Sequence, residues 1–305
     1  MILSNHRYHS NRAIGVFRQL LGTATTPGMA QRFRQTSNAS KKPIKVSLAP
    51  MQQPIHHHCG NPLNALLEKS QPVRRLAREL NRPGYHPTPL TLGTTQDPYQ
   101  AGSKRLEQTR GILQLLLAHK HPVHIITKSH LIVKDLDILA EMAEQRLCTV
   151  EVCLHTLDTQ LSRQIEPNTS SPTARLKTIS RLSDTGIPVG ANVAPLIPVV
   201  NDADMEQLLS AAKKAGAWAA GYQYLDLPTE ALGDFQHWLE KHYPEQAERI
   251  LRLSQANVNS CAAEFARMVQ QRFQLCCQKL NLSYTGLPLL DTTLFQVPSS
   301  NGLSN

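Results

Sequence analysis

The side chains best placed to do chemistry stand directly after short apolar segments. Lys128 follows Val123–Thr127, and an ammonium group there can hold a carboxylate or a ribose hydroxyl. A lysine at the end of an apolar segment can equally extend into solvent, so the residue type leaves both roles open. Asp97 precedes a proline, which is ordinary turn chemistry, and the local pattern favours a turn over a ligand contact.

Cys153 and His155 form a second candidate pair. Alternate residues of a strand face the same side, so the imidazole could activate the thiol as a nucleophile. Free cysteines are more often small buried hydrophobic residues, and we expect Cys153 to be one of these. Glu166 precedes Pro167 in a long loop, where we expect its carboxylate to be solvated.

The cysteine and histidine pattern favours neither a disulfide framework nor a zinc site. None of the six cysteines in 305 residues lies in a C-x-x-C motif, and we expect free thiols in a reducing cytoplasm. The run His56–Cys59 offers zinc-type ligands, but adjacent residues cannot easily all turn toward one ion, so we expect a polar loop. The sequence also has no Gly-rich phosphate loop and no Gly-x-Ser-x-Gly elbow.

The positive charge is concentrated at the beginning of the sequence. Residues 1–67 carry eight of the 32 basic side chains and no acidic one, which leaves 24 basic against 23 acidic side chains in the remainder. The composition of 1–71 is typical of a disordered basic arm or a transit peptide, and equally of a misread segment. The near-neutral remainder gives no electrostatic support for a nucleic-acid partner.

Composition also restricts the remaining function classes. No run of eighteen uncharged apolar residues is present, so we expect no membrane span. Aromatic residues make up 5% of the chain, which argues against extensive stacking surfaces for single-stranded nucleic acid.

From Pro72 onward, helical and extended patterns alternate about every thirty residues. Extended segments are expected at 89–93, 123–127, 149–154, 187–195 and 218–225, and helices at 73–81, 104–119, 133–146, 173–185 and 202–215, the last capped by Asn201 or Asp202. A helical stretch is also expected around Cys261–Cys277. Such alternation predicts an α/β protein with a parallel sheet, either doubly wound or a full or partial (β/α) barrel.

Both architectures bind ligands at the carboxyl ends of their strands. The residues expected there are polar and chemically mixed, which favours a small polar cofactor: 94–97, 127–129, 153–156, 193–195 and 224–226.

Short ordered strings then identify a family resemblance. In the first half of the chain these strings include Arg82-Pro83-Gly84-Tyr85, Asp97-Pro98-Tyr99-Gln100 and Ile126-Thr127-Lys128-Ser129. Later ones include Thr156-Leu157-Asp158, Glu166-Pro167 and Ala194-Pro195-Leu196-Ile197-Pro198. In order and spacing, Pro72 to Pro298 resembles the spore photoproduct lyase-like branch of the radical SAM superfamily.

The resemblance implies a partial (β/α)6 barrel of TIM-like type that binds S-adenosylmethionine across its open top. By position, Lys128 would approach the carboxylate or ribose of the cofactor, with Thr94 and Thr95 nearby. Val193 and Ala194 would line the adenine through their backbone, and Asp97 and Cys153 belong to the same cofactor-binding set. The family also uses a 4Fe-4S cluster held by three cysteines in a C-x-x-x-C-x-x-C loop after its first strand.

The sequence departs from the family at that loop. Cys59 is the only cysteine before Pro72, and the later cysteines have the wrong spacing, so no metal ligands are assigned. We therefore expect a basic segment over 1–71, a radical SAM-like domain over 72–298 and a flexible tail over 299–305. Other positions have drifted too, including Cys153 in place of a small hydroxyl residue.

Two hypotheses follow for the function. In the first, the protein is a radical SAM enzyme of lyase or DNA-repair type, inactive as this chain because the sequence is incomplete or misread at its beginning. In the second, it is a cluster-free descendant that keeps the barrel for binding or scaffolding. A nucleic-acid partner follows from family analogy alone.

Overall fold

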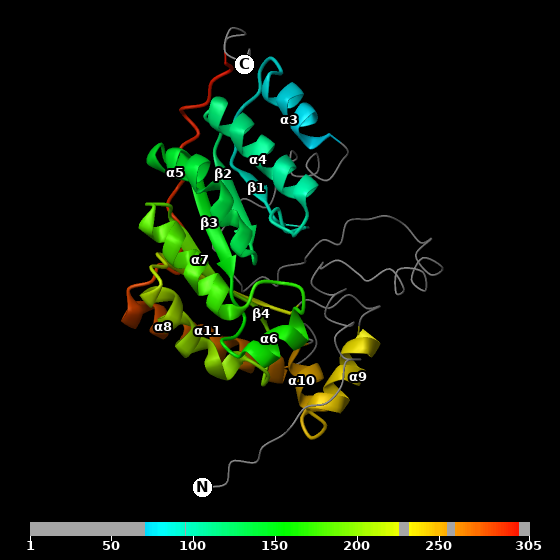
Figure 1. Ribbon diagram of the computed structural model, residues 1–305. Coiled ribbons are helices and arrows are strands. Elements are labelled where there is room, and N and C mark those ends of the chain that lie inside the picture. The colour runs from blue at the N-terminus through cyan, green and yellow to red at the C-terminus, as the bar shows by residue number, and fades with distance from the viewer. Residues whose placement is uncertain (1–70, 95, 226–231, 255–259, 299–305) are drawn as a thin grey trace, which may run out of the picture.

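The computed structural model describes residues 71–94, 96–225, 232–254 and 260–298. Five parallel strands form one sheet whose spatial order is the chain order (Figure 1). They are β1 (Leu90–Leu92), β2 (Val123–Thr127), β3 (Cys148–Cys153), β4 (Val189–Leu196) and β5 (Ala219–Tyr224). The register pairs Ile125 with Val150, and Val150 with Val189, so apolar residues form rows across the sheet.

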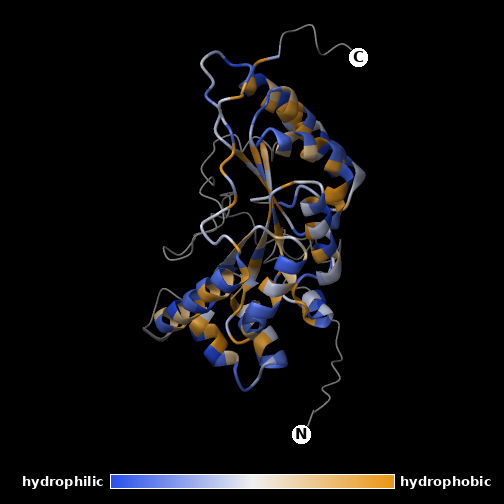
Figure 2. Ribbon diagram, turned by 90° about the vertical axis from the view of Figure 1, so that its left-hand side faces the viewer, coloured by the Kyte–Doolittle hydropathy of each residue, from blue (hydrophilic) through white to orange (hydrophobic). Residues whose placement is uncertain are grey.

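Helices connect the strands and cover one face of the sheet. In chain order they are α3 (Pro72–Leu80), α4 (Ser103–Ala118), η2 (His130–Asp135) with α5 (Leu136–Glu144), α7 (Pro172–Asp184), and η3 (Asp202–Asp204) with α8 (Met205–Lys214). Their buried residues, such as Leu113, Met142 and Leu182, share one core with the strand residues Ile125 and Val150. Figure 2 shows orange residues in the strands and mixed blue and orange helices around them, as amphipathic packing requires.

The in-order sheet decides between the two architectures that the sequence left open. A doubly wound sheet reverses its strand order at a switch point, which places helices on both faces. Here each strand lies beside the next one in the chain, so right-handed crossovers place the helices on one face. The fold is therefore α/β of the partial-barrel type.

The second face of the sheet is polar. His124 and Thr149 pair in register, and the His124 Nδ1 lies 2.9 Å from the Thr149 hydroxyl. Glu151, two residues further along β3, accepts a hydrogen bond from Asn192 of β4 and lies 3.7 Å from the His124 Nε2. All four side chains are at most 6% exposed. Apolar residues thus face the helices, whereas the inner face of the partial barrel is lined with hydrogen-bonding groups.

The two ends of the sheet are covered by different segments. Residues 283–296 cross the amino ends, where Ser283 binds the backbone of Trp218, Asp291 pairs with Arg146 and the Gln296 N–H binds the His119 carbonyl. Near the carboxyl ends, α6 (Thr159–Ile165), α9 (Leu232–His242) and α10 (Ala247–Ser254) share a smaller core. A last helix, α11 (Ser260–Leu280), packs along α8 through Arg272 and Glu206. In parallel α/β folds the ligand binds at the carboxyl ends of the strands, the end near α6, α9 and α10.

Most expected elements are present, and the differences concern helices and one cap. The helix expected at 133–146 is η2 followed by α5, and α6, α9 and α10 were not placed from the sequence. Asn201 stands at the expected N-cap position of η3, but its side chain makes no capping hydrogen bond. Its amide binds the carbonyls of His155 and Pro195 instead, and Asp202 contacts Arg272 and the Val199 N–H. The expectations for residues 1–70 and 299–305 lie outside the described residues. No described helix is long and apolar enough to cross a bilayer.

Candidate functional site

Asp97 joins the loop after β1 to the end of β2. Its Oδ1 accepts hydrogen bonds from the Tyr99 N–H at 2.9 Å and the Thr127 hydroxyl at 2.7 Å. Its Oδ2 accepts the Lys128 N–H at 2.9 Å. Both carboxylate oxygens are thus used to fix the chain around the predicted ligand residue Lys128. The loop itself depends on Gly93, whose φ is +101° and where a Cβ would lie 2.0 Å from the carbonyl oxygen of Ile126.

Lys128 reaches across to a buried ion pair. Its Nζ donates to the Glu166 Oε1 at 2.8 Å, and the Glu166 Oε2 accepts from Arg175 of α7. The side chains of Glu166 and Arg175 are each 1% exposed, and that of Lys128 is 19% exposed. An ion pair between the partly exposed Lys128 and the buried Glu166 therefore joins the end of β2 to the loop after α6.

The expectation that Glu166 is solvated was wrong. Burial on its own would raise the pKa of the Glu166 carboxyl, but the charges of Arg175 and Lys128 outweigh it and hold the pKa well below its usual value. The sequence pattern missed this because the partner cation, Arg175, lies nine residues further along on a different element. The sequence offered one signal of the buried pair, which is Arg175 within the amphipathic helix expected at 173–185. Arginines in such helices usually face water, so this signal is weak.

Arg175 connects Glu166 to the carboxyl end of β3. Its Nε donates to the Ser170 carbonyl and its Nη1 to the Cys153 carbonyl, both at 2.9 Å, and its Nη2 donates to the Thr169 hydroxyl at 2.6 Å. Each nitrogen of the guanidinium is thus engaged. Asp97, Lys128, Glu166, Arg175 and Cys153 are thereby linked through successive polar contacts across three strand ends.

His155 and Cys153 do not form an activated pair. His155 Nδ1 lies 3.5 Å from both the Glu166 carboxylate and the Arg175 guanidinium. Burial lowers the pKa of His155 to about 4 and raises that of the Cys153 thiol to about 12. At neutral pH the imidazole is uncharged and the thiol is protonated, which disfavours thiolate chemistry.

The remaining predicted residues lie on β1 and β4. Thr94 is exposed directly after β1, and Thr95 lies outside the described residues. Val193 is buried and Ala194 is half-buried within β4, where the pairing with β5 shifts between Val193 and Leu196. The structure therefore brings Asp97, Lys128 and Cys153 into one polar network, with the backbone of β4 beside β3.

Two buried polar atoms near the carboxyl ends of β3 and β4 have no hydrogen-bond partner in the described part of the chain. They are the Nε2 of His155 and the Oδ1 of Asn192. Buried polar groups are normally paired, so unpaired ones at a strand end are what a polar ligand would satisfy. S-adenosylmethionine, with its amino, carboxylate and hydroxyl groups, fits such a surface.

A four-iron cluster does not fit the described residues. They contain no group of three His, Cys, Asp or Glu side chains able to hold a metal ion. Among the side chains that the structure describes, Cys148 and Cys153 of β3 and the adjacent Cys276 and Cys277 of α11 have free thiols.

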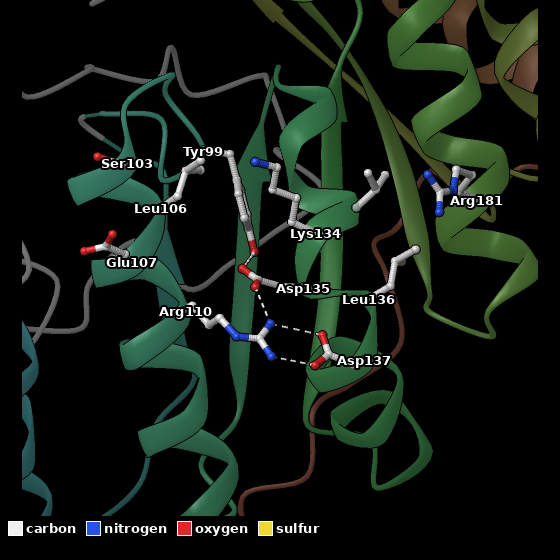
Figure 3. Close-up of a pocket in the computed structure, with 11 residues that line it drawn as sticks. Tyr99, Ser103, Leu106, Glu107, Arg110, Lys134, Asp135, Leu136, Asp137 and Arg181 are labelled. Atoms are coloured by element: carbon white, nitrogen blue, oxygen red, sulfur yellow. Dashed lines mark hydrogen bonds and ion pairs between the residues drawn. The ribbon is translucent and has the colours of Figure 1, made fainter.

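A separate pocket of about 660 Å³ lies between the outer helices (Figure 3). Arg110 of α4 lines it and pairs with Asp135 at 2.7 Å and with Asp137 at 2.6 Å. Lys134 and Arg181 are also on its wall. None of the predicted ligand residues lines this pocket, so we assign the candidate site to the strand ends, where the buried charges lie.

The single parallel sheet with its strands in chain order defines an α/β barrel-type protein, and the buried polar network at the carboxyl ends of the strands is its candidate site. Residues 62–212, about half of the chain, match the profile of the Radical SAM superfamily. The chain belongs to the radical SAM superfamily, whose members use S-adenosylmethionine with an iron–sulfur cluster.

Curated relatives match a little more than half of the chain. An uncharacterized protein of Mycobacterium tuberculosis is 35% identical over 180 residues, 58% of this chain and 53% of the relative. Another, from Methanocaldococcus jannaschii, is 27% identical over 161 residues, 53% of this chain and 59% of the relative. The chain thus spans somewhat more than half the length of these curated relatives.

Among solved structures, spore photoproduct lyase complexed with dinucleoside spore photoproduct is 12% identical with a TM-score of 0.48. The alignment covers 68% of this chain and 63% of that one. A variant with bound AdoMet and the same dinucleoside is 15% identical with a TM-score of 0.43, covering 57% and 50%. Family membership rests on the profile match, because likenesses of this size do not define a branch.

Proposed function

We propose that this chain binds S-adenosylmethionine at the carboxyl ends of β2, β3 and β4. The observation that carries the proposal is Lys128, which stands at the end of β2 with its ammonium oriented by Glu166. Lys128 would hold the carboxylate of the ligand, and the backbone of Val193 and Ala194 would line the adenine. Thr94, Thr95, Asp97 and Cys153 complete the proposed set, with Asp97 and Cys153 acting through the loops that they fix.

We further propose that these 305 residues do not support the radical reaction alone. Radical cleavage of S-adenosylmethionine needs an iron with an open coordination position, which three thiolates provide when they hold a four-iron cluster. The printed sequence contains no C-x-x-x-C-x-x-C. The same chain would then act as a binding or scaffolding protein, in the cytoplasm that its free thiols favour.

Two measurements on the purified chain test these proposals. Equilibrium dialysis with labelled S-adenosylmethionine should give saturable binding of one ligand per chain, and the absence of binding would contradict the first proposal. Anaerobic reconstitution with iron and sulfide should leave less than one cluster per chain and no 5′-deoxyadenosine. Stoichiometric cluster uptake with cleavage of the ligand would show that the second proposal is wrong.

Lyase or repair activity on nucleic acid is the second candidate function. It is favoured by the family, and the near-neutral charge of residues 68–305 gives it no electrostatic support. Sequencing the coding DNA upstream of residue 72 in all three frames separates the candidates. A three-cysteine motif in a displaced frame favours the enzyme, and its absence favours the binding protein.

A further inference from the structure

We propose that Glu166 is the positioning residue that sets the Lys128 ammonium for the carboxylate of bound S-adenosylmethionine. This inference rests on the proposed function and adds a residue outside the predicted ligand set. Glu166 lies 38 residues from Lys128 in sequence and follows a different strand, yet the two side chains meet at 2.8 Å.

A lysine side chain has four rotatable carbon links and no preferred direction of its own. At the end of β2, the Lys128 backbone is fixed because its N–H binds Asp97. The ammonium is fixed at the other end of the side chain by the Glu166 Oε1. Lys128 is therefore held at both ends, and Glu166 supplies a contact that holds the ammonium in place.

Glu166 can act in this way because it is itself immobile. Its N–H binds the Ser162 carbonyl at 2.7 Å, and its Oε2 accepts from Arg175. Arg175 is tied in turn to the carbonyls of Cys153 and Ser170 at 2.9 Å. The carboxylate is thus anchored to the end of β3, the strand beside the one that carries Lys128.

The charges at the site are consistent with a shared ammonium. Glu166 is buried between Lys128 and Arg175, and His155 beside it is uncharged at neutral pH. The other carboxylate close to Lys128, that of Asp97, already accepts three hydrogen bonds from its own loops. An ammonium has three N–H donors, so a contact with Glu166 is compatible with a second contact to a ligand carboxylate.

A purely structural ion pair would have a different signature from a positioning residue. Losing a structural pair would weaken every ligand of the site alike. Losing a positioning contact would weaken only the ligand group that Lys128 holds. Decarboxylated S-adenosylmethionine lacks that carboxylate and so separates the two cases.

The test is calorimetric titration of both ligands into the full chain and its variants. The wild-type chain should prefer S-adenosylmethionine, and Lys128→Met should reduce this preference by about 10- to 100-fold, the usual contribution of a charge-assisted hydrogen bond. Glu166→Gln should reduce it in the same direction, with little change in the affinity for the decarboxylated ligand. The double variant Lys128→Met with Glu166→Gln should lose no more of this preference than Lys128→Met alone. The control Lys134→Met, on the outer pocket, should keep the preference of the wild type.

Three outcomes would overturn the inference. A preference that Glu166→Gln leaves intact would show that Glu166 does not position Lys128, and an equal loss for both ligands would show a structural role. If the wild-type chain binds neither ligand, the proposed function itself fails, and this inference fails with it. Should Glu166→Gln not fold by circular dichroism, Glu166→Asp is measured instead, since it keeps the charge but withdraws it from Lys128 and should also reduce the preference.

Discussion

Replacing Arg175 with methionine removes the cation that compensates the buried Glu166. The variant keeps a long side chain of similar reach in α7, but it leaves Glu166 with Lys128 as its remaining charged donor among the described contacts. It also removes hydrogen bonds to the Cys153 and Ser170 carbonyls. Breaking a buried ion pair from one side costs about 3–5 kcal/mol, because the other charge stays buried without its partner. The free energy of unfolding should fall by about that amount, a large part of the 5–15 kcal/mol roughly typical of a domain.

Urea unfolding followed by far-ultraviolet circular dichroism measures this loss. Arg181→Met is the matched control, because Arg181 lies on the same helix and is exposed; it should change the free energy of unfolding by about 0.5 kcal/mol or less. The double variant Glu166→Gln with Arg175→Met should lose less than the sum of the two single losses, by about 1–3 kcal/mol. A loss for Arg175→Met no larger than that for Arg181→Met would refute the assignment of a buried pair.

Three further predictions follow from buried groups and backbone geometry. Burial lowers the pKa of His155 and His121 to about 4, below the unfolded value near 6.5, so the unfolded chain binds more protons between these limits. The free energy of unfolding should therefore be highest above pH ~6.5 and fall as the pH drops toward 4. Replacing either histidine with glutamine should reduce this fall, which urea unfolding at several pH values measures. A pH dependence that neither replacement changes would contradict the prediction. Gly93→Ala should destabilise the fold by more than Gly84→Ala, which carries only the ~1–2 kcal/mol strain of a left-handed backbone, because a Cβ at Gly93 also meets a backbone carbonyl; equal thermal shifts would show that the close approach is absent. Cys153, with its pKa raised to about 12, should resist iodoacetamide at pH 8 in the folded chain, and site-resolved mass spectrometry that finds it modified as fast as in urea would refute this.

The sequence predicted the sheet well because its strands are short apolar runs between clear helix and turn signals. Val123–Thr127 was placed to the residue, and the other four strands were placed within two residues at each end. The α/β class followed from the alternation, whereas partial barrel against doubly wound sheet did not. That choice depends on which strands lie side by side, a long-range property that local periodicity does not encode.

Part of the polar network at the strand ends could be located from the sequence. Lys128 and Asp97 both follow expected strands in the sequence, so the expected topology was enough to place them near a site at the carboxyl ends. Glu166 and Arg175 come from a loop and a helix, and each looks solvated until the other is placed beside it. A carboxylate can be buried only when a cation is placed beside it, and that depends on two residues that lie on different elements. An expectation drawn from Glu166 alone therefore wrongly gave it as solvated.

The location of the ligand site is tested most directly by ultraviolet crosslinking of methyl-labelled S-adenosylmethionine to the full chain, followed by peptide mapping. The label is expected on peptides that contain the carboxyl ends of β2, β3 or β4, competed by unlabelled ligand and reduced in Lys128→Met. Label on α4 or α5 peptides would move the site to the outer pocket. Label that unlabelled ligand does not displace would contradict a specific site at the strand ends.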